Sequence, residues 1–71
     1  MMLMQMTPVV SSNIHSIGYE NSTLYVRFHS GGLYAYHHVP ESIYIGLMNA
    51  PSHGHFLHEH VKGHFSYTRL S

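Results

Sequence analysis

The sequence predicts an α+β fold: a three-stranded antiparallel β-meander with two short C-terminal helices on one face and a possible final edge strand. Three observations lead to this fold. Residues 23–29 and 33–39 alternate with the period of two that strands require, and residues 13–19 form a shorter, imperfect strand pattern. The period changes to that of a helix after Pro40. Turn-forming residues separate the segments, and 71 residues suffice for one small domain.

The strands are expected at residues 13–19, 23–29 and 33–39. The second strand has the clearest alternation, with Leu24, Val26 and Phe28 on one face. Turns are expected at residues 20–22 and at 30–32, where two glycines can supply the positive φ angles of a tight hairpin.

The tyrosines are assigned to the face of the sheet that the helices do not cover. In the third strand Leu33 alternates with Tyr34 and Tyr36, so the apolar residue is placed toward the core. Tyr25, Tyr34 and Tyr36 are therefore expected to share the opposite face. Such a face can contact another subunit or stack nucleobases.

The first helix is expected to start with Pro40 at its first position, where the missing N–H costs nothing. Ile43, Leu47 and Met48 then form an apolar stripe at helical spacing. The helix should end before Pro51, because the residue that precedes proline avoids the α region.

Ser52 is a good N-cap for a second helix, whose apolar face contains Phe56, Leu57 and Val61, with His60 beside them. Lys62-Gly63 is a typical helix end. The tail, residues 64–70, alternates well enough to form an edge strand.

The composition favours self-association, and the sequence contains no recognisable targeting segment. The chain has three basic residues, three acidic residues, nine histidines and no cysteine. A net charge near zero in so short a chain favours association, and a homo-oligomer is expected. No segment predicts a membrane span or a signal peptide, so a cytoplasmic protein is expected.

We expect an N-terminal arm at residues 1–10 and a single domain at residues 11–70. The arm contains Met1, Met2, Met4 and Met6, which either form a frayed terminus or contact a partner subunit.

Four motifs in order resemble the KTSC domain family. They are "SS.I..IGY" at residues 11–19, "L.V.F.SGG.Y.Y..VP" at 24–40, "APS.G.F" at 50–56 and "VKG.F.Y.RL" at 61–70. The resemblance implies a small domain found alone in bacteria and phages or attached to larger enzymes. It implies no shared catalytic mechanism. Family members tend to have lysines where this chain has His53, His55 and His58.

The preferred functional hypothesis is a non-catalytic module that recognises a phosphate-bearing ligand, either a nucleotide or nucleic acid. A helix N-terminus carries free N–H groups and partial positive charge, which favour phosphate. The candidate ligand-binding residues are Tyr36, Ser52, His53, Gly54, His55, Phe56, Lys62 and Arg69. If a phage encodes the chain, the module could sequester a nucleotide signal in a pocket between subunits, as an anti-defence protein would.

Two other functions remain open. The tyrosine face could make the chain a structural or regulatory protein–protein module. Alternatively, His53, His55, His58 and His60 could bind a metal, although no zinc module has their spacing and no metal or other cofactor is expected. Catalysis has little support, because the three glutamates are isolated and no aspartate could orient a histidine base.

Overall fold

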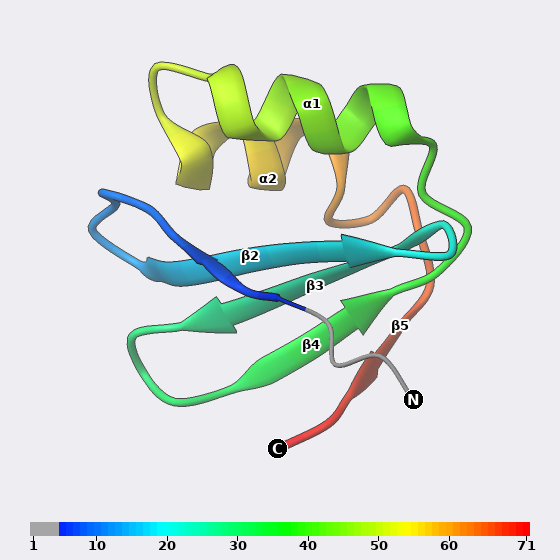
Figure 1. The fold of residues 1–71 in the computed structure, drawn as a ribbon, viewed down its shortest axis with the longest axis horizontal. Coiled ribbons are helices and arrows are strands. Elements are labelled where there is room, and N and C mark those ends of the chain that lie inside the picture. Colours follow the sequence, from blue (N-terminus) through cyan, green and yellow to red (C-terminus); the bar gives the residue numbers. More distant parts are fainter. Residues whose placement is uncertain (1–4) are drawn as a thin grey trace.

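The computed structural model describes residues 5–71 and shows an antiparallel sheet with two helices on one face (Figure 1). The five strands are β1 (Thr7–Pro8), β2 (Ile14–Glu20), β3 (Thr23–Phe28), β4 (Leu33–Tyr36) and β5 (Tyr67–Arg69). The helices α1 (Glu41–Asn49) and α2 (His53–His60) connect β4 to β5. The strand order β1-β2-β3-β4-β5 is that of a meander. The predicted α+β fold is confirmed, including its final edge strand.

The N-terminal arm contributes a strand that the sequence did not indicate. Thr7 pairs with Ile17 and Pro8 with Ser16, so β1 is the edge strand beside β2. Proline removes a backbone donor, which an edge strand tolerates. Met6 is half-buried, and Met1, Met2 and Met4 lie outside the described residues.

The register between β3 and β4 corrects the predicted position of two tyrosines. Leu24 pairs with Tyr36 and Val26 pairs with Tyr34, and paired residues share a face. Tyr34 and Tyr36 therefore lie on the helix-covered face with the core leucine and valine. Only Tyr25 lies on the opposite face, where it pairs with Ala35.

The length of the β3–β4 loop causes this register. The Phe28 N–H donates to the Gly32 carbonyl at 2.9 Å, which closes a loop of three residues, 29–31. Gly31 has φ +109° and supplies the left-handed residue that such a loop needs. Leu33 is consequently opposite Arg27, on the outer face.

The third strand is also shorter than predicted. β4 ends at Tyr36, and His38 has φ +57°, which turns the chain out of the sheet. Val39 then enters the core, fully buried, and its N–H donates to the Ser22 carbonyl at 2.8 Å.

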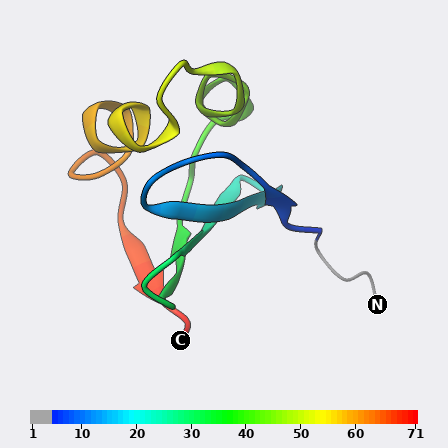
Figure 2. The ribbon, with the colours of Figure 1, turned by 90° about the vertical axis from the view of Figure 1, so that its left-hand side faces the viewer.

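The core lies between the sheet and the two helices (Figure 2). Eight of its aliphatic side chains have no exposed surface: Ile14, Ile17, Leu24, Val26, Val39, Leu47, Leu57 and Val61. Tyr44 of α1 stacks on Tyr19 of β2, with ring centroids 4.9 Å apart. Burying each such aliphatic side chain stabilises the fold by about 1.5–3 kcal/mol.

The helices begin and end where the sequence predicts, except at Pro40. Pro40 is the N-cap of α1, with φ −64° and ψ 150°, and not its first helical residue. The Ser52 hydroxyl caps α2 as predicted by accepting a hydrogen bond from the His55 N–H. Gly63, with φ +83°, lies just beyond the end of α2.

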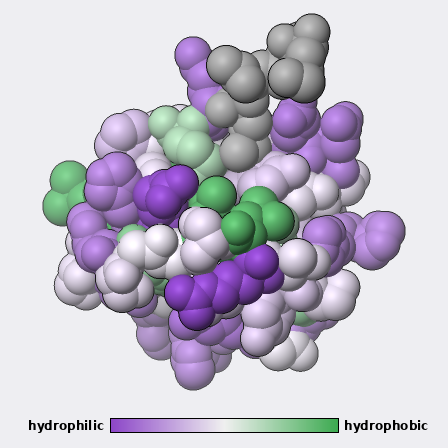
Figure 3. All heavy atoms as spheres, turned by 90° about the horizontal axis from the view of Figure 1, so that it is seen from below, coloured by the Kyte–Doolittle hydropathy of each residue, from purple (hydrophilic) through white to green (hydrophobic). Residues whose placement is uncertain are grey.

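The side chains on the outer face of the sheet include small ones and a long polar one. Ser16 and Ala35 are almost completely buried there, and Arg27 is half-buried. Figure 3 shows this side as small hydrophobic spots separated by hydrophilic surface. Within residues 5–71, no helix is long and apolar enough to span a membrane.

Two aliphatic residues of α1 test how much burial in the core contributes to the free energy of unfolding. Leu47 is fully buried and Ile45 is 51% exposed. Leu47→Ala should lower the free energy of unfolding by about 2–5 kcal/mol, because it removes buried methyl groups and leaves a cavity. Ile45→Ala should change it by no more than about 0.5 kcal/mol. Urea unfolding followed by circular dichroism measures both, and similar losses would contradict the assigned helix face.

Candidate functional site

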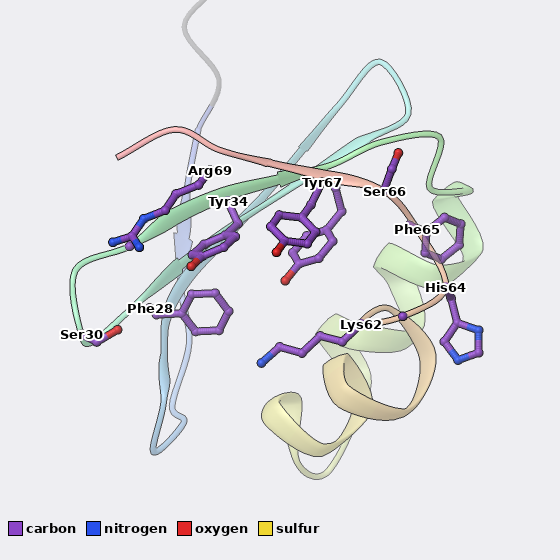
Figure 4. A pocket seen from close by; sticks show the side chains of 12 residues that line it. Phe28, Ser30, Tyr34, Lys62, His64, Phe65, Ser66, Tyr67 and Arg69 are labelled. Atoms are coloured by element: carbon purple, nitrogen blue, oxygen red, sulfur yellow. The ribbon is translucent and has the colours of Figure 1, made fainter.

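A groove of about 1040 Å³ lies between the sheet and the segment that follows α2. Its wall is formed by residues of β3, β4 and β5, of the loop between β3 and β4, and of the segment that follows α2. Five Phe and Tyr rings contribute to it: Tyr36 and, labelled in Figure 4, Phe28, Tyr34, Phe65 and Tyr67. We call this site the aromatic groove.

Strand pairing gathers the tyrosines. Tyr36 pairs with Tyr67 across β4 and β5, and Tyr34 pairs with Arg69, so all four side chains lie on one face. The Tyr67 ring centroid is 5.5 Å from that of Tyr34 and 5.7 Å from that of Tyr36. The Phe28 ring meets Tyr34 edge-on at 5.5 Å. These distances are typical of favourable aromatic pairs.

Two cations lie against the same rings. The Lys62 Nζ atom is 5.2 Å from the centroid of Phe28, and the Arg69 guanidinium carbon is 5.6 Å from the centroid of Tyr34. Both distances allow cation–π attraction. Lys62 and Arg69 are two of the three Lys and Arg residues in the chain. The described residues that line the groove include no Asp or Glu, so the groove favours an anionic ligand with an unsaturated ring.

The hydroxyl of Tyr36 stays protonated at physiological pH. Burial raises the pKa of Tyr36 above its ordinary value of 10.0, and repulsion from Tyr34 and Tyr67 raises it further. The phenol therefore remains a neutral hydrogen-bond donor in the groove.

The N-terminus of α2 forms a separate, smaller hollow of about 580 Å³, lined by residues 10–13 and 51–55. Several polar groups of this hollow already form hydrogen bonds within the chain. The Ser52 hydroxyl accepts from the His55 N–H at 3.2 Å, and His53 Nδ1 is 2.8 Å from the Leu47 carbonyl. A Cβ atom added to Gly54 would come within 2.5 Å of Asn13 Oδ1, so Asn13 occupies the space beside this glycine.

The eight predicted ligand-binding residues therefore do not form one site. Tyr36, Lys62 and Arg69 line the aromatic groove. Residues 52–55 line the hollow at the N-terminus of α2. Phe56 packs between the helices, where a Cβ atom on Gly46 would come within 2.7 Å of its ring.

The histidines of α2 point in different directions. His53 bonds to the end of α1, the His60 ring lies 4.4 Å from Phe56, and His55 and His58 are exposed. Over residues 5–71, no group of three or more His, Cys, Asp or Glu side chains is placed to hold a metal ion.

Sequence reasoning missed four of the five rings in the groove. Phe28, Tyr34, Phe65 and Tyr67 were not among the eight candidate ligand-binding residues, although Tyr34 was expected on a face of the sheet that could stack nucleobases. The "Y.Y" alternation at residues 34–36 and the "Y.R" alternation at 67–69 each place two side chains on one face. Together these two alternations were the available signal, because adjacent strands with matching faces combine such pairs into one surface.

These features define a small α+β domain with an aromatic, cationic groove. The model of the KTSC domain matches residues 10–65, and the chain belongs to this family. A crystal structure of a KTSC domain protein from Yersinia pestis superimposes with a TM-score of 0.93 at 39% sequence identity. The match covers 97% of this chain and 100% of the Yersinia chain.

Lysine–tRNA ligases are also similar to this chain. The enzyme from Nostoc sp. is 45% identical over 49 residues, which are 69% of this chain and 9% of the ligase. The enzyme from Trichormus variabilis is 42% identical over 62 residues, which are 84% of this chain and 11% of the ligase. The chain thus spans about a tenth of the length of these relatives.

Ser52→Ala tests the structural role of the α2 cap. The variant should lose about 0.5–2 kcal/mol of stability, because the N–H of His55 loses its partner. Ser12 is an exposed serine of the same hollow, and Ser12→Ala should change stability by no more than about 0.5 kcal/mol. Thermal unfolding compares the two variants. Equal melting temperatures would show that the cap contributes nothing.

Tyr36 should make the fold sensitive to alkaline pH. The pKa of Tyr36 is higher in the folded state than in the unfolded chain, so its stabilising contribution is complete below about pH 10 and is lost as the pH rises through the folded-state pKa. The free energy of unfolding should therefore fall less steeply above about pH 10 in Tyr36→Phe than in the natural protein. Urea unfolding at a series of pH values measures this slope, and parallel profiles would contradict the expectation.

Proposed function

We propose that this domain is a non-catalytic module that binds nucleic acid in the aromatic groove, with RNA as the preferred ligand. Lys62 and Arg69 contact phosphates, and the rings between them pack against bases. The observation that carries the proposal is the position of both cations against rings of the same groove.

The physical chemistry of the groove supports this ligand. Phosphate contacts by Lys and Arg supply most of the affinity for nucleic acid, and aromatic side chains supply stacking surfaces for unpaired bases. Arg can also contact a phosphate through two N–H groups. In Arg69, Nε–H donates to the Ser71 carbonyl at 3.0 Å, which orients the guanidinium and leaves its terminal N–H groups for a ligand.

The relatives support RNA as the first ligand to test. Lysine–tRNA ligases, by their name, act on a tRNA, and they contain a segment up to 45% identical to this chain. A similar domain that also occurs alone fits a module that brings RNA-binding capacity to different proteins.

The groove offers few side chains for acid–base catalysis, since His64 is the histidine among its described lining residues. None of the described residues that line the groove is a carboxylate, so a general acid or base of that type is missing from its wall.

The groove is also built from residues of a single chain. The proposal therefore does not require a pocket between subunits, and a free nucleotide is a competing ligand for the same surface.

Charge removal at the groove tests the proposal. Lys62→Gln and Arg69→Gln should each weaken binding of a fluorescein-labelled RNA oligonucleotide at low salt. Each substitution should also reduce the slope of log K against log salt by about 0.7–0.9, because one phosphate contact is lost. Fluorescence anisotropy over a range of salt concentrations measures both effects.

Arg27 is the matched control. It is the remaining basic side chain of the three, and it lies on the outer face of the sheet. Arg27→Gln changes the net charge by the same amount, and its affinity and salt slope should stay close to those of the natural protein. An equal effect of all three substitutions would indicate general charge attraction and would contradict binding in the groove.

A further inference from the structure

We infer that the aromatic groove selects single-stranded over double-stranded nucleic acid and spans more than one nucleotide without reading base sequence. This inference rests on the proposed function and specifies the ligand of the same groove. It depends on the exposure of the rings, on their angles and on the positions of the two cations.

The rings of the groove can contact only bases that are not stacked in a duplex. Tyr67 is 59% exposed, and Phe28 and Tyr34 are half-buried, so part of each ring is accessible. In a duplex, the faces of the bases are covered by their neighbours, and only base edges and the sugar–phosphate backbone remain accessible. An aromatic wall therefore gains its stacking energy only from a single strand.

The ring angles favour separated bases. The Phe28 ring is inclined by 85° to that of Tyr34, and the Tyr67 ring by 45° to those of Tyr34 and Tyr36. The Tyr34 and Tyr36 rings are within 21° of parallel, so the wall combines two similarly oriented rings with two that are inclined to them and is not one flat platform. Bases of a flexible single strand can follow such a wall, whereas the parallel bases of a continuous stack cannot.

The two cations lie at opposite sides of the Phe28 and Tyr34 rings. Arg69 extends beside Tyr34 and away from Lys62, which reaches toward Phe28 from the segment after α2 (Figure 4). A strand that passes from one cation to the other places a phosphate near each and bases on the rings between them. A single nucleotide monophosphate can satisfy only one of these two positions.

The groove lacks the amide and carboxylate side chains that read adenine and cytosine by hydrogen bonds. Its described wall contains no Asn, Gln, Asp or Glu, and bidentate amide and carboxylate contacts are standard means of reading adenine and cytosine. Stacking tolerates every base, because each has a π face. Binding should therefore depend weakly on sequence.

The experiment compares ligands by fluorescence anisotropy on the natural protein at low salt. The probes are labelled ten-nucleotide U, A and C homopolymers, a blunt RNA duplex of the same length, and unlabelled UMP as a competitor. The three single strands should bind within about tenfold of one another. The duplex should bind at least tenfold more weakly, and UMP should compete only at concentrations far above those of the oligonucleotides.

Tyr67 supplies the test of stacking. Tyr67→Leu removes an exposed ring and should weaken single-strand binding by about five- to 150-fold, the range typical for the loss of one stacked base. Tyr67→Phe keeps the ring and should bind within about twofold of the natural protein. Tyr25→Leu removes a ring from the opposite face and should leave binding unchanged. Circular dichroism confirms that each variant is folded.

The outcomes separate this inference from the proposed function. Equal or tighter binding of the duplex would overturn the single-strand preference while nucleic-acid binding remains. A homopolymer preferred by 100-fold or more would overturn sequence tolerance, and UMP affinity equal to that of the oligonucleotides would overturn the extended site. A Tyr67→Leu variant that binds normally would overturn stacking. If no nucleic acid binds, both the inference and the proposed function fail.

Discussion

The structure depends on a mismatch between a wide sheet and two short helices. The sheet has five strands, whereas the two helices on its face have only nine and eight residues. The helices can therefore cover only part of one face. Aliphatic side chains such as Ile17 and Leu24 fill the covered part completely. On the same face of β4 and β5, the residues are aromatic, and their rings remain partly accessible in the groove.

The register of one hairpin decides which residues meet in that groove. Alternation within the sequence located β2, β3 and the start of β4, because the alternation of side chains within one strand does not depend on its neighbours. It did not show which face of β4 matches which face of β3, since that depends on the number of residues in the loop. The three-residue loop pairs Val26 with Tyr34. Leu33, the more apolar residue, consequently lies outside, and the two tyrosines lie with the core.

The candidate site was only partly predictable for a related reason. Ser52 was recognised as a cap because capping is local in sequence. The contacts that occupy the adjacent hollow come from other elements: the Leu47 carbonyl of α1 lies near His53, and Asn13, far away in the sequence, lies beside Gly54. No local pattern indicates such partners. Lys62 and Arg69 were singled out for their charge, but their common position at the aromatic groove required the tertiary structure.

The end of α2 links the stability of the fold to the geometry of the groove. The N–H groups of Val61 and Lys62 both donate to the Leu57 carbonyl, at 3.0 and 2.9 Å, and Gly63 then adopts a left-handed φ. This sharp ending reverses the chain toward β5 and leaves Lys62 above the Phe28 ring. Val61 is fully buried in the core. The position of the cation is therefore fixed by packing one residue away, which holds the charge at the groove without a carboxylate partner in its described wall.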